Sequence, residues 1–391
     1  MPTRGVELPE RWVTPEVLRW AREQVGLSVE LAARKLGLAP ETIMAWETGE
    51  DSPLLRDLEL LAEIYDCPVG YFFLASPPSS EDLRLDFRGV APGKEASFTY
   101  ETRLRLRQFV RLIDYASYLL QSLEIRWEPS IPTSAADGSI ESIVSRALEQ
   151  LGIDSQTRSK WSSPQQAFDG WRAAIEQQGI FVIALKLGPG ELRGASVWTD
   201  PGPPSILVNH ADVEAATGRC FTLLHEYAHL LIGQQGMACD FRGQGDQAAI
   251  ERFANSFAAE SIVPRKVFVG FLKANHRHMF REFWGDSLLD EIRAPFQASR
   301  DTVAILLEDL SLAPRGYYSQ RRRMWDRRRP FGRPGRGGGQ TKVDRRIREL
   351  GYNLSTLLSA ADRQGVTSKL ELAEILDMKV ERTSEFIAAV T

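Results

Sequence analysis

The segment CFTLLHEYAHLLIG, residues 220–233, decides the fold of the central part of this chain. Its apolar residues recur at helical spacing, it contains no proline, and a glycine closes it, so the pattern predicts a helix. On a helix, His225 and His229 lie at i and i+4, and their imidazoles leave the same face close enough to share one metal ion. Glu226 projects beside them, where a carboxylate can take a proton from water.

The HExxH spacing is specific for this chain. Only five residues are histidine, and random placement gives HExxH in roughly half a percent of such chains. The structural alternative is a pair of core histidines bonded to carbonyl groups. Apolar helix faces rarely bury two histidines and a glutamate without pairing them. The segment is therefore typical of a zinc metallopeptidase.

A catalytic zinc keeps three protein ligands and one open position, so a third ligand is required. The downstream stretch AAIERFANSFAAESIVP, residues 248–264, has a second apolar helical pattern that ends before a proline. Glu251 stands twenty-two residues after His229, which leaves room for a loop and a returning helix. Asn255 follows on the same face and can orient a zinc-bound histidine. Glu260 remains the main alternative ligand.

These two motifs resemble the ImmA/IrrE family of bacterial metallo-endopeptidases. The similarity covers about residues 140–310 and includes AFDGWRAAIEQQGIFVIAL, LRGASVW and ILVNHADVEAATGRCFTLLHE. It implies Zn²⁺ as cofactor, His225, His229 and Glu251 as ligands and Glu226 as general base. It also implies a protein substrate, a cytoplasmic transcription repressor or partner protein in a stress, mobile-element or toxin-antitoxin setting. Phe253 replaces a residue that is often acidic in the family, and we expect it to pack in the core.

Composition is consistent with a soluble protein of two or three domains. The chain has 391 residues, 43% of them hydrophobic, which is enough for sizeable cores. Cys67, Cys220 and Cys239 are scattered and odd in number, which argues against a disulfide framework. No leader or membrane-spanning apolar run is apparent. We therefore expect a cytoplasmic protein with no membrane partner.

The first 78 residues resemble an Xre-type helix-turn-helix domain of five short helices, with LAARKLGLAPETIMAWETG, residues 31–49, as the specific element. The resemblance implies a structural ion pair between Arg22 and Glu47. It also makes operator DNA a candidate partner.

DNA binding by this domain is one of two open readings. The recognition helix would expose Glu41 and Thr42, with Arg34 and Lys35 near the backbone, and it lacks the usual base-reading side chains. Residues 1–78 carry thirteen acidic and seven basic side chains, a balance of −6, so little counterion release is available. A protein-docking or dimerisation module is the other reading.

The remaining segments complete the predicted architecture. Residues 101–123 form a long amphipathic helix that packs on the peptidase or on a second copy in a homodimer. Strands are expected at 180–185, 193–199 and 205–209, and 193–199 is the candidate edge for an extended substrate. Eight arginines within 320–339 indicate an unpacked linker. No internal repeat is apparent.

We therefore predict an α+β, mostly helical chain. Its parts are a five-helix helix-turn-helix domain, a zincin-like metallopeptidase domain with a small sheet, and a small C-terminal helical unit. The expected boundaries are 1–78 for the helix-turn-helix domain, 79–138 for the linker and long helix, 139–314 for the peptidase, 315–341 for the Arg/Gly-rich linker and 342–391 for the last unit. The alternative function is a DNA-binding regulator or antitoxin-like protein whose metal site is structural or vestigial.

Overall fold

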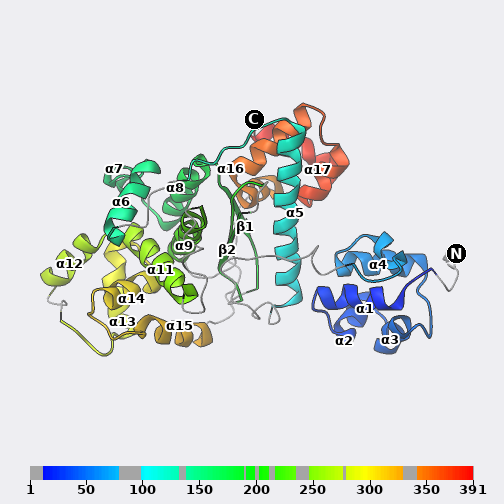
Figure 1. Ribbon diagram of the computed structural model, residues 1–391, viewed down its shortest axis with the longest axis horizontal. Coiled ribbons are helices and arrows are strands. Elements are labelled where there is room, and N and C mark those ends of the chain that lie inside the picture. Colours follow the sequence, from blue (N-terminus) through cyan, green and yellow to red (C-terminus); the bar gives the residue numbers. More distant parts are fainter. Residues whose placement is uncertain are drawn as a thin grey trace. The chain divides into compact units, whose positions relative to one another are not determined.

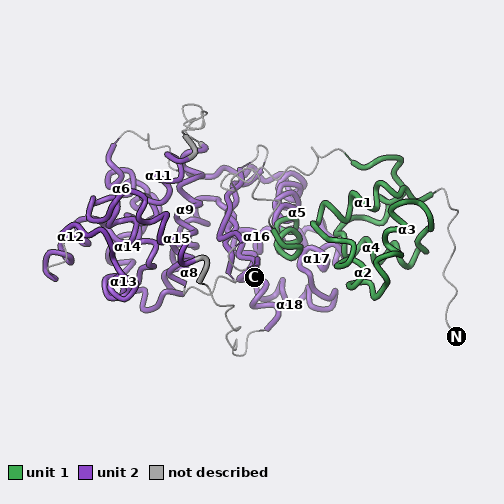
Figure 2. The backbone as a smooth tube through the Cα atoms, turned by 90° about the horizontal axis from the view of Figure 1, so that it is seen from below, with its two compact units in different colours: residues 1–86, 91–108 green, residues 87–90, 109–391 purple. Residues whose placement is uncertain are grey.

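The computed structural model describes residues 12–78, 98–131, 138–188, 191–198, 202–210, 216–234, 246–275, 279–328 and 341–390. The chain divides into two compact units (Figure 2). Unit 1 comprises Met1–Asp86 and Ala91–Gln108, and unit 2 comprises Phe87–Val90 and Phe109–Thr391. In the described part of the chain, none of the helices combines the length and apolarity that crossing a bilayer requires.

Unit 1 has the predicted helix-turn-helix layout, with a 3₁₀ helix as its fifth element. Its elements are α1 (Pro15–Gln24), α2 (Val29–Leu36), α3 (Pro40–Thr48), α4 (Leu55–Tyr65) and η1 (Val69–Phe73). The side chain of Arg22 donates two hydrogen bonds to Glu47, at 2.6 and 2.8 Å, and both residues are buried. A buried pair with bidentate geometry fixes α1 against α3, as the sequence predicted.

The long amphipathic helix is α5 (Tyr100–Ser122), which begins in unit 1 and ends in unit 2. Its apolar stripe is buried as expected, at Leu106, Phe109, Leu112, Ile113, Ala116, Leu119 and Leu120. Arg107, one of the arginines between these positions, donates to the carbonyl oxygens of Tyr65 and Asp66. That arginine therefore secures α5 within unit 1.

The sheet of unit 2 has three strands in the order β1-β3-β2. They are β1 (Phe181–Leu185), β2 (Gly194–Val197) and β3 (Ser205–Asn209). The central strand β3 runs parallel to β1 and antiparallel to β2. β1 and β3 are buried at every position, which explains their continuous apolar sequence. β2 hydrogen-bonds only to β3 among the described strands, so it is an edge strand as predicted.

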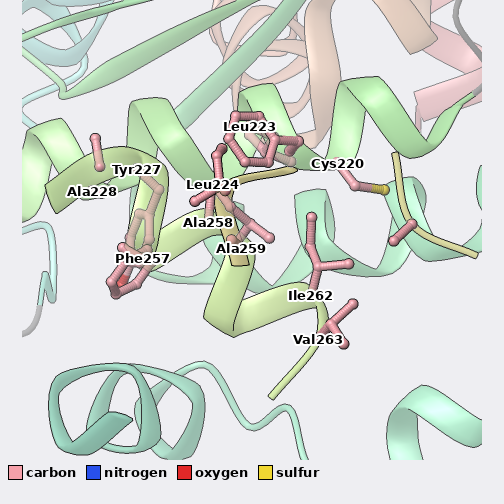
Figure 3. Packing of buried hydrophobic residues seen from close by; sticks show 14 of the residues in the cluster. Cys220, Leu223, Leu224, Tyr227, Ala228, Phe257, Ala258, Ala259, Ile262 and Val263 are labelled. Atoms are coloured by element: carbon pink, nitrogen blue, oxygen red, sulfur yellow. The ribbon is translucent and has the colours of Figure 1, made fainter. Parts of the chain in front are cut away.

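Helices surround this sheet and form most of unit 2 (Figure 1). They are α6 (Ile140–Gln150), α7 (Ser155–Ser159), α8 (Pro164–Gln177), α9 (Ala216–Gln234), α11 (Asp246–Ile262), α12 (Arg265–Ala274), α13 (Asp286–Arg293), η4 (Ala294–Phe296), α14 (Arg300–Asp309) and α15 (Tyr317–Arg328). The two helices that carry the motifs, α9 and α11, pack directly on each other. Figure 3 shows Leu223, Leu224 and Tyr227 of α9 near Phe257 and Ala258 of α11. This apolar contact sets the distance between the motifs.

The arginine-rich stretch differs from the expected linker over residues 317–328, which form α15. Arg321 is buried between the rings of Phe283 and Trp325 and pairs with Asp286. Its aliphatic stem and planar head cover apolar surface while the charge is compensated. Residues 329–340 lie outside the described part.

The C-terminal helices belong to unit 2 and do not form a separate compact unit. They are α16 (Lys342–Arg363), α17 (Lys369–Leu376), η5 (Val380–Arg382) and α18 (Thr383–Val390). α16 bends at Gly351 and lies along β1. Asn353 donates to the carbonyl oxygens of Glu176 and Ile180, at 2.7 and 3.0 Å. These buried bonds join the end of the chain to the sheet.

The turn after α17 has the same C-terminal geometry as the turn after α2. Ser28 and Ser368 each cap a helix of eight residues by accepting a backbone N–H. Gly37 and Asp377 then adopt the left-handed conformation, with φ of 69° and 50°. In both turns the following N–H bonds to the alanine carbonyl five residues earlier, at 2.9 Å. The same pattern ends α4, where Asp66 has φ 52° and the N–H of Cys67 bonds to the carbonyl oxygen of Ala62 at 3.1 Å, so it is a recurrent helix C-cap in the described part of the chain.

Candidate metal centre

Three predicted ligands converge on one point. The Nε2 atoms of His225 and His229 lie 3.1 Å apart, and each is 3.4 Å from a carboxylate oxygen of Glu251. All three candidate ligand atoms fall within 4.8 Å of one another. The i, i+4 spacing on α9 turns both imidazoles toward α11, and the packing of the two helices brings the carboxylate to them.

This donor set fits a zinc ion. Two imidazole nitrogens and one carboxylate are the ligands of many catalytic zinc sites. The pKa values indicate how the cluster behaves without a cation. Burial, together with the charge of His225, lowers the pKa of His229 to about 4. Burial acts to lower the pKa of His225 as well, but the hydrogen bond and charge of Glu251 and the charge of Glu226 outweigh it and raise that pKa. The two adjacent imidazoles are therefore not both positively charged, and His229 stays neutral, the form that binds a metal.

Glu226 lies beside the cluster in a dry environment. Its side chain is 5% exposed, and burial raises its pKa to about 7. The hydroxyl of Ser196 on β2 donates a hydrogen bond to Oε2 of Glu226 at 3.0 Å. Gly194, two residues earlier, lies so close to Thr222 that a Cβ atom would collide with its side chain and would also press against Glu226, at 3.0 Å from its Cγ. Because Gly194 and Ser196 are small, β2 can pack directly against the carboxylate of Glu226.

The sequence pattern predicts β2 but not this role of Ser196 and Gly194. The sequence does contain a clue to this role, since Gly194, Ala195 and Ser196 are three small residues in a row. Small side chains in a strand indicate close approach of another backbone or helix. Strand periodicity alone does not say which helix approaches.

Asn255 lies one turn after Glu251 on α11 and next to His225, whose pKa its amide helps to raise. The Nδ1 atom of His225 is buried and has no partner of standard hydrogen-bond geometry among the described residues. That ring nitrogen needs an acceptor when Nε2 binds a metal. The side chain of Asn255 interacts with this imidazole, so it is the candidate to orient the ring.

The rival ligand Glu260 lies elsewhere. Its Oε2 accepts the backbone N–H of Arg265 at 3.0 Å and stays close to the guanidinium of that residue. It thus supports the start of α12. His210 follows β3, and it does not belong to the cluster; burial lowers its pKa. His276 and His278 lie outside the described residues. The Tyr227 side chain is fully buried beside Phe257, away from a catalytic position.

The candidate DNA contacts of unit 1 have mixed surroundings. Glu41 and Arg34 are exposed, and Thr42 is half-buried on α3. The ammonium group of Lys35 lies 4.3 Å from the ring centroid of Tyr100, so it is engaged in a cation–π contact. The described surface of α3 also exposes Met44. For contact with DNA, these positions therefore offer the guanidinium of Arg34, while Glu41 adds a negative charge.

Two family models match the chain. A peptidase M78 model, described as an IrrE N-terminal-like domain, matches residues 175–308, and a helix-turn-helix model matches residues 18–72. The first match contains His225, Glu226, His229 and Glu251. Neither the curated proteins nor the solved structures give a match. The chain therefore has the architecture of the ImmA/IrrE family, an N-terminal helix-turn-helix domain followed by an IrrE N-terminal-like domain.

Proposed function

We propose that the protein is a zinc-dependent endopeptidase that cleaves a cytoplasmic protein. The observation that carries this proposal is the convergence of two imidazoles and one carboxylate beside a buried glutamate. His225, His229 and Glu251 would hold the ion. A zinc ion in that position supplies Lewis acidity that polarises a peptide carbonyl and makes water a stronger acid.

The residues of the chain would then act in defined roles. Glu226 accepts a proton from the attacking water and passes it to the leaving amine, a task suited to a buried carboxylate beside the ligand His225. Ser196 holds Oε2 of that carboxylate and so fixes its orientation. Asn255 fixes the ring of His225. Burial of the glutamate excludes bulk water from the proton transfer.

Strand β2 offers the place for an extended substrate. Its outer edge has no strand partner within the described residues, and its inner side touches Glu226 through Gly194. A peptide that adds to this edge would run past the carboxylate with its backbone hydrogen-bonded to β2. Arg193, at the start of the strand, is anchored to the buried Asp301 at 3.2 Å, which also accepts a hydrogen bond from Arg322.

The protein substrate that we propose is a transcription repressor or partner protein, in a bacterial stress, mobile-element or toxin-antitoxin context. The test is to purify the full chain, measure its zinc content and incubate it with helix-turn-helix repressors encoded next to its gene. We expect one zinc per chain and cleavage by the wild type but not by Glu226→Gln. Glu226→Gln supplies no ligand atom and should keep the metal. Equal cleavage by both proteins would contradict the proposal.

Operator binding by unit 1 is the second candidate function, supported by the helix-turn-helix match at residues 18–72. It would make the chain a DNA-binding regulator or antitoxin-like protein. Arg34 would touch the phosphate backbone near Glu41 and Thr42. The test is a binding titration with upstream DNA at two salt concentrations, comparing wild type with Arg34→Ala. Binding that weakens with salt and with this substitution would support it. Salt-sensitive binding by a zinc-containing protein without cleavage would favour the regulator over the enzyme.

A further inference from the structure

A cavity of about 760 Å³ opens beside the metal centre. It shares Glu251 and Asn255 with that centre and continues along α11 to the end of α14 and the start of α15. These three helices are neighbours within unit 2 (Figure 1). A cavity of this size accommodates a side chain together with adjoining backbone.

The carboxylates that line the cavity have partners of their own. Glu308 accepts the backbone N–H groups of Gly316 and Tyr318, both at 2.8 Å, at the start of α15. Asp309 accepts hydrogen bonds from Ser256 at 2.7 Å and Arg265 at 2.6 Å. Glu251 belongs to the metal cluster. The negative charges of the lining are therefore compensated by a helix N-terminus, by a guanidinium and by the proposed cation.

Two arginines that line the cavity differ from these carboxylates, because they have no oppositely charged partner among the described residues. Arg252 follows the ligand Glu251, and Arg315 precedes α15; both are exposed at the cavity. Neither makes an ion pair with another residue in the described part of the chain. The guanidinium groups come from two elements, and a planar guanidinium is well suited to a carboxylate. The unsatisfied charge of the cavity is thus positive.

We propose that this cavity is a specificity pocket for an acidic side chain of the peptide substrate, held by Arg252 and Arg315 next to the scissile bond. The proposal rests on the proposed peptidase function, because only a peptide that crosses the metal centre places a side chain there. A carboxylate in the cavity replaces water around both guanidinium groups. Because Glu251, a proposed metal ligand, lines the cavity, the pocket should recognise an aspartate or glutamate of the substrate within about two residues of the cleaved bond.

The first test is a cleavage profile. The zinc-loaded full chain is incubated with a peptide mixture prepared from a proteome digest, and the cleaved bonds are read by mass spectrometry. We expect Asp and Glu to be enriched about tenfold at one position near the cut. Arg252→Ala/Arg315→Ala should lose that preference, and Arg252→Glu/Arg315→Glu should turn it toward Lys and Arg. Lys266→Ala/Lys273→Ala, on the exposed side of α12, removes the same charge elsewhere and should keep it.

The second test does not depend on turnover. Glu226→Gln loaded with zinc is titrated with a fluorescent decapeptide that carries one glutamate, and with the same peptide carrying alanine or lysine there. Binding of the glutamate peptide about tenfold tighter, lost in the double arginine variant, supports the pocket. Equal binding of the three peptides overturns it, as does equally tight binding of succinate or inorganic phosphate alone. Cleavage without acidic preference overturns the pocket and leaves the peptidase standing. Charge-selective binding without any cleavage by the wild type contradicts the peptidase instead.

Discussion

The hydroxyl of Ser196 donates a hydrogen bond to Glu226 at 3.0 Å, from an edge strand to the first turn of the HEYAH motif. Both side chains are buried. The bond therefore determines which oxygen of the carboxylate is left to face a reacting water. It also links the strand that would bind substrate to the group that would move the proton.

Replacing Ser196 by alanine should lower kcat by about tenfold with little change in KM, because one hydrogen bond to the carboxylate is lost. Zinc content should not change, since Ser196 supplies no ligand. The control is Ser205→Ala, a buried serine on the neighbouring strand whose hydroxyl bonds to the carbonyl of Pro203. Steady-state kinetics on a cleaved repressor or peptide checks this. A purely structural role of Ser196 would give the two variants similar kinetics and similar losses of stability.

The two helices that carry the candidate ligands were predictable because their chemistry and their periodicity coincide. The i, i+4 spacing of His225 and His229 has one geometric consequence on a helix, and the apolar pattern around Glu251 required a second helix packed on the first. The Arg22–Glu47 pair came from the resemblance to a known domain type. These features depend on local sequence or on a family pattern.

Other features depend on contacts between distant segments. Burial of Arg321 requires two aromatic rings and the distant Asp286. From composition alone, an arginine in this stretch is expected to be exposed to solvent. The contact of Ser196 with Glu226 is fixed by the packing of β2 on α9. Single-sequence periodicity contains none of this information.

Removal of the metal should destabilise unit 2. Without a cation, two buried imidazoles lie beside two carboxylates. Bound zinc would stabilise the folded state by mass action, by about 4 kcal/mol when the free zinc concentration is a thousand times Kd. We expect a chelator to lower the Tm of the wild type and of Glu226→Gln equally. Glu251→Ala should already have the lower Tm and should not respond. Calorimetry with and without chelator measures this, and an unchanged wild-type Tm would be the contrary result.

Acid should weaken the contact between α13 and α14 through Asp290. The hydrogen bond from Arg300 is the main cause that lowers the pKa of Asp290 to about 2, with Arg293 adding to it against the effect of burial. A depressed carboxyl pKa stabilises the fold above the unfolded value of about 3.9 and loses that contribution as pH falls toward 2. The stability difference between wild type and Asp290→Asn should therefore be largest above about pH 4 and should shrink toward pH 2. Urea unfolding at several pH values measures it, with the exposed Glu282→Gln as control. A difference that is independent of pH would exclude this role.

Gly351 should be the least replaceable glycine of the C-terminal helices. It bends α16 with φ 81° and ψ 177°, a conformation that is almost restricted to glycine. A Cβ atom there would collide with Glu176 and Arg172, a buried pair whose carboxylate accepts the N–H of Tyr352 at 2.9 Å. Gly351→Ala should thus cost backbone strain and also separate α16 from β1, about 3 kcal/mol or more in total.

Gly365 provides the matched control for this substitution. It also has a positive φ, 69°, but a Cβ atom would meet nothing within 4 Å. Gly365→Ala should cost only the left-handed strain, about 1 kcal/mol. Thermal unfolding of the three full-length proteins measures both losses. We expect Gly351→Ala to lower the Tm of unit 2 clearly more than Gly365→Ala. That result would show that the packing of α16 on β1 depends on the close approach of Gly351 to the Arg172–Glu176 pair. Equal losses would show that backbone conformation alone matters, and that the buried pair tolerates a side chain at the bend.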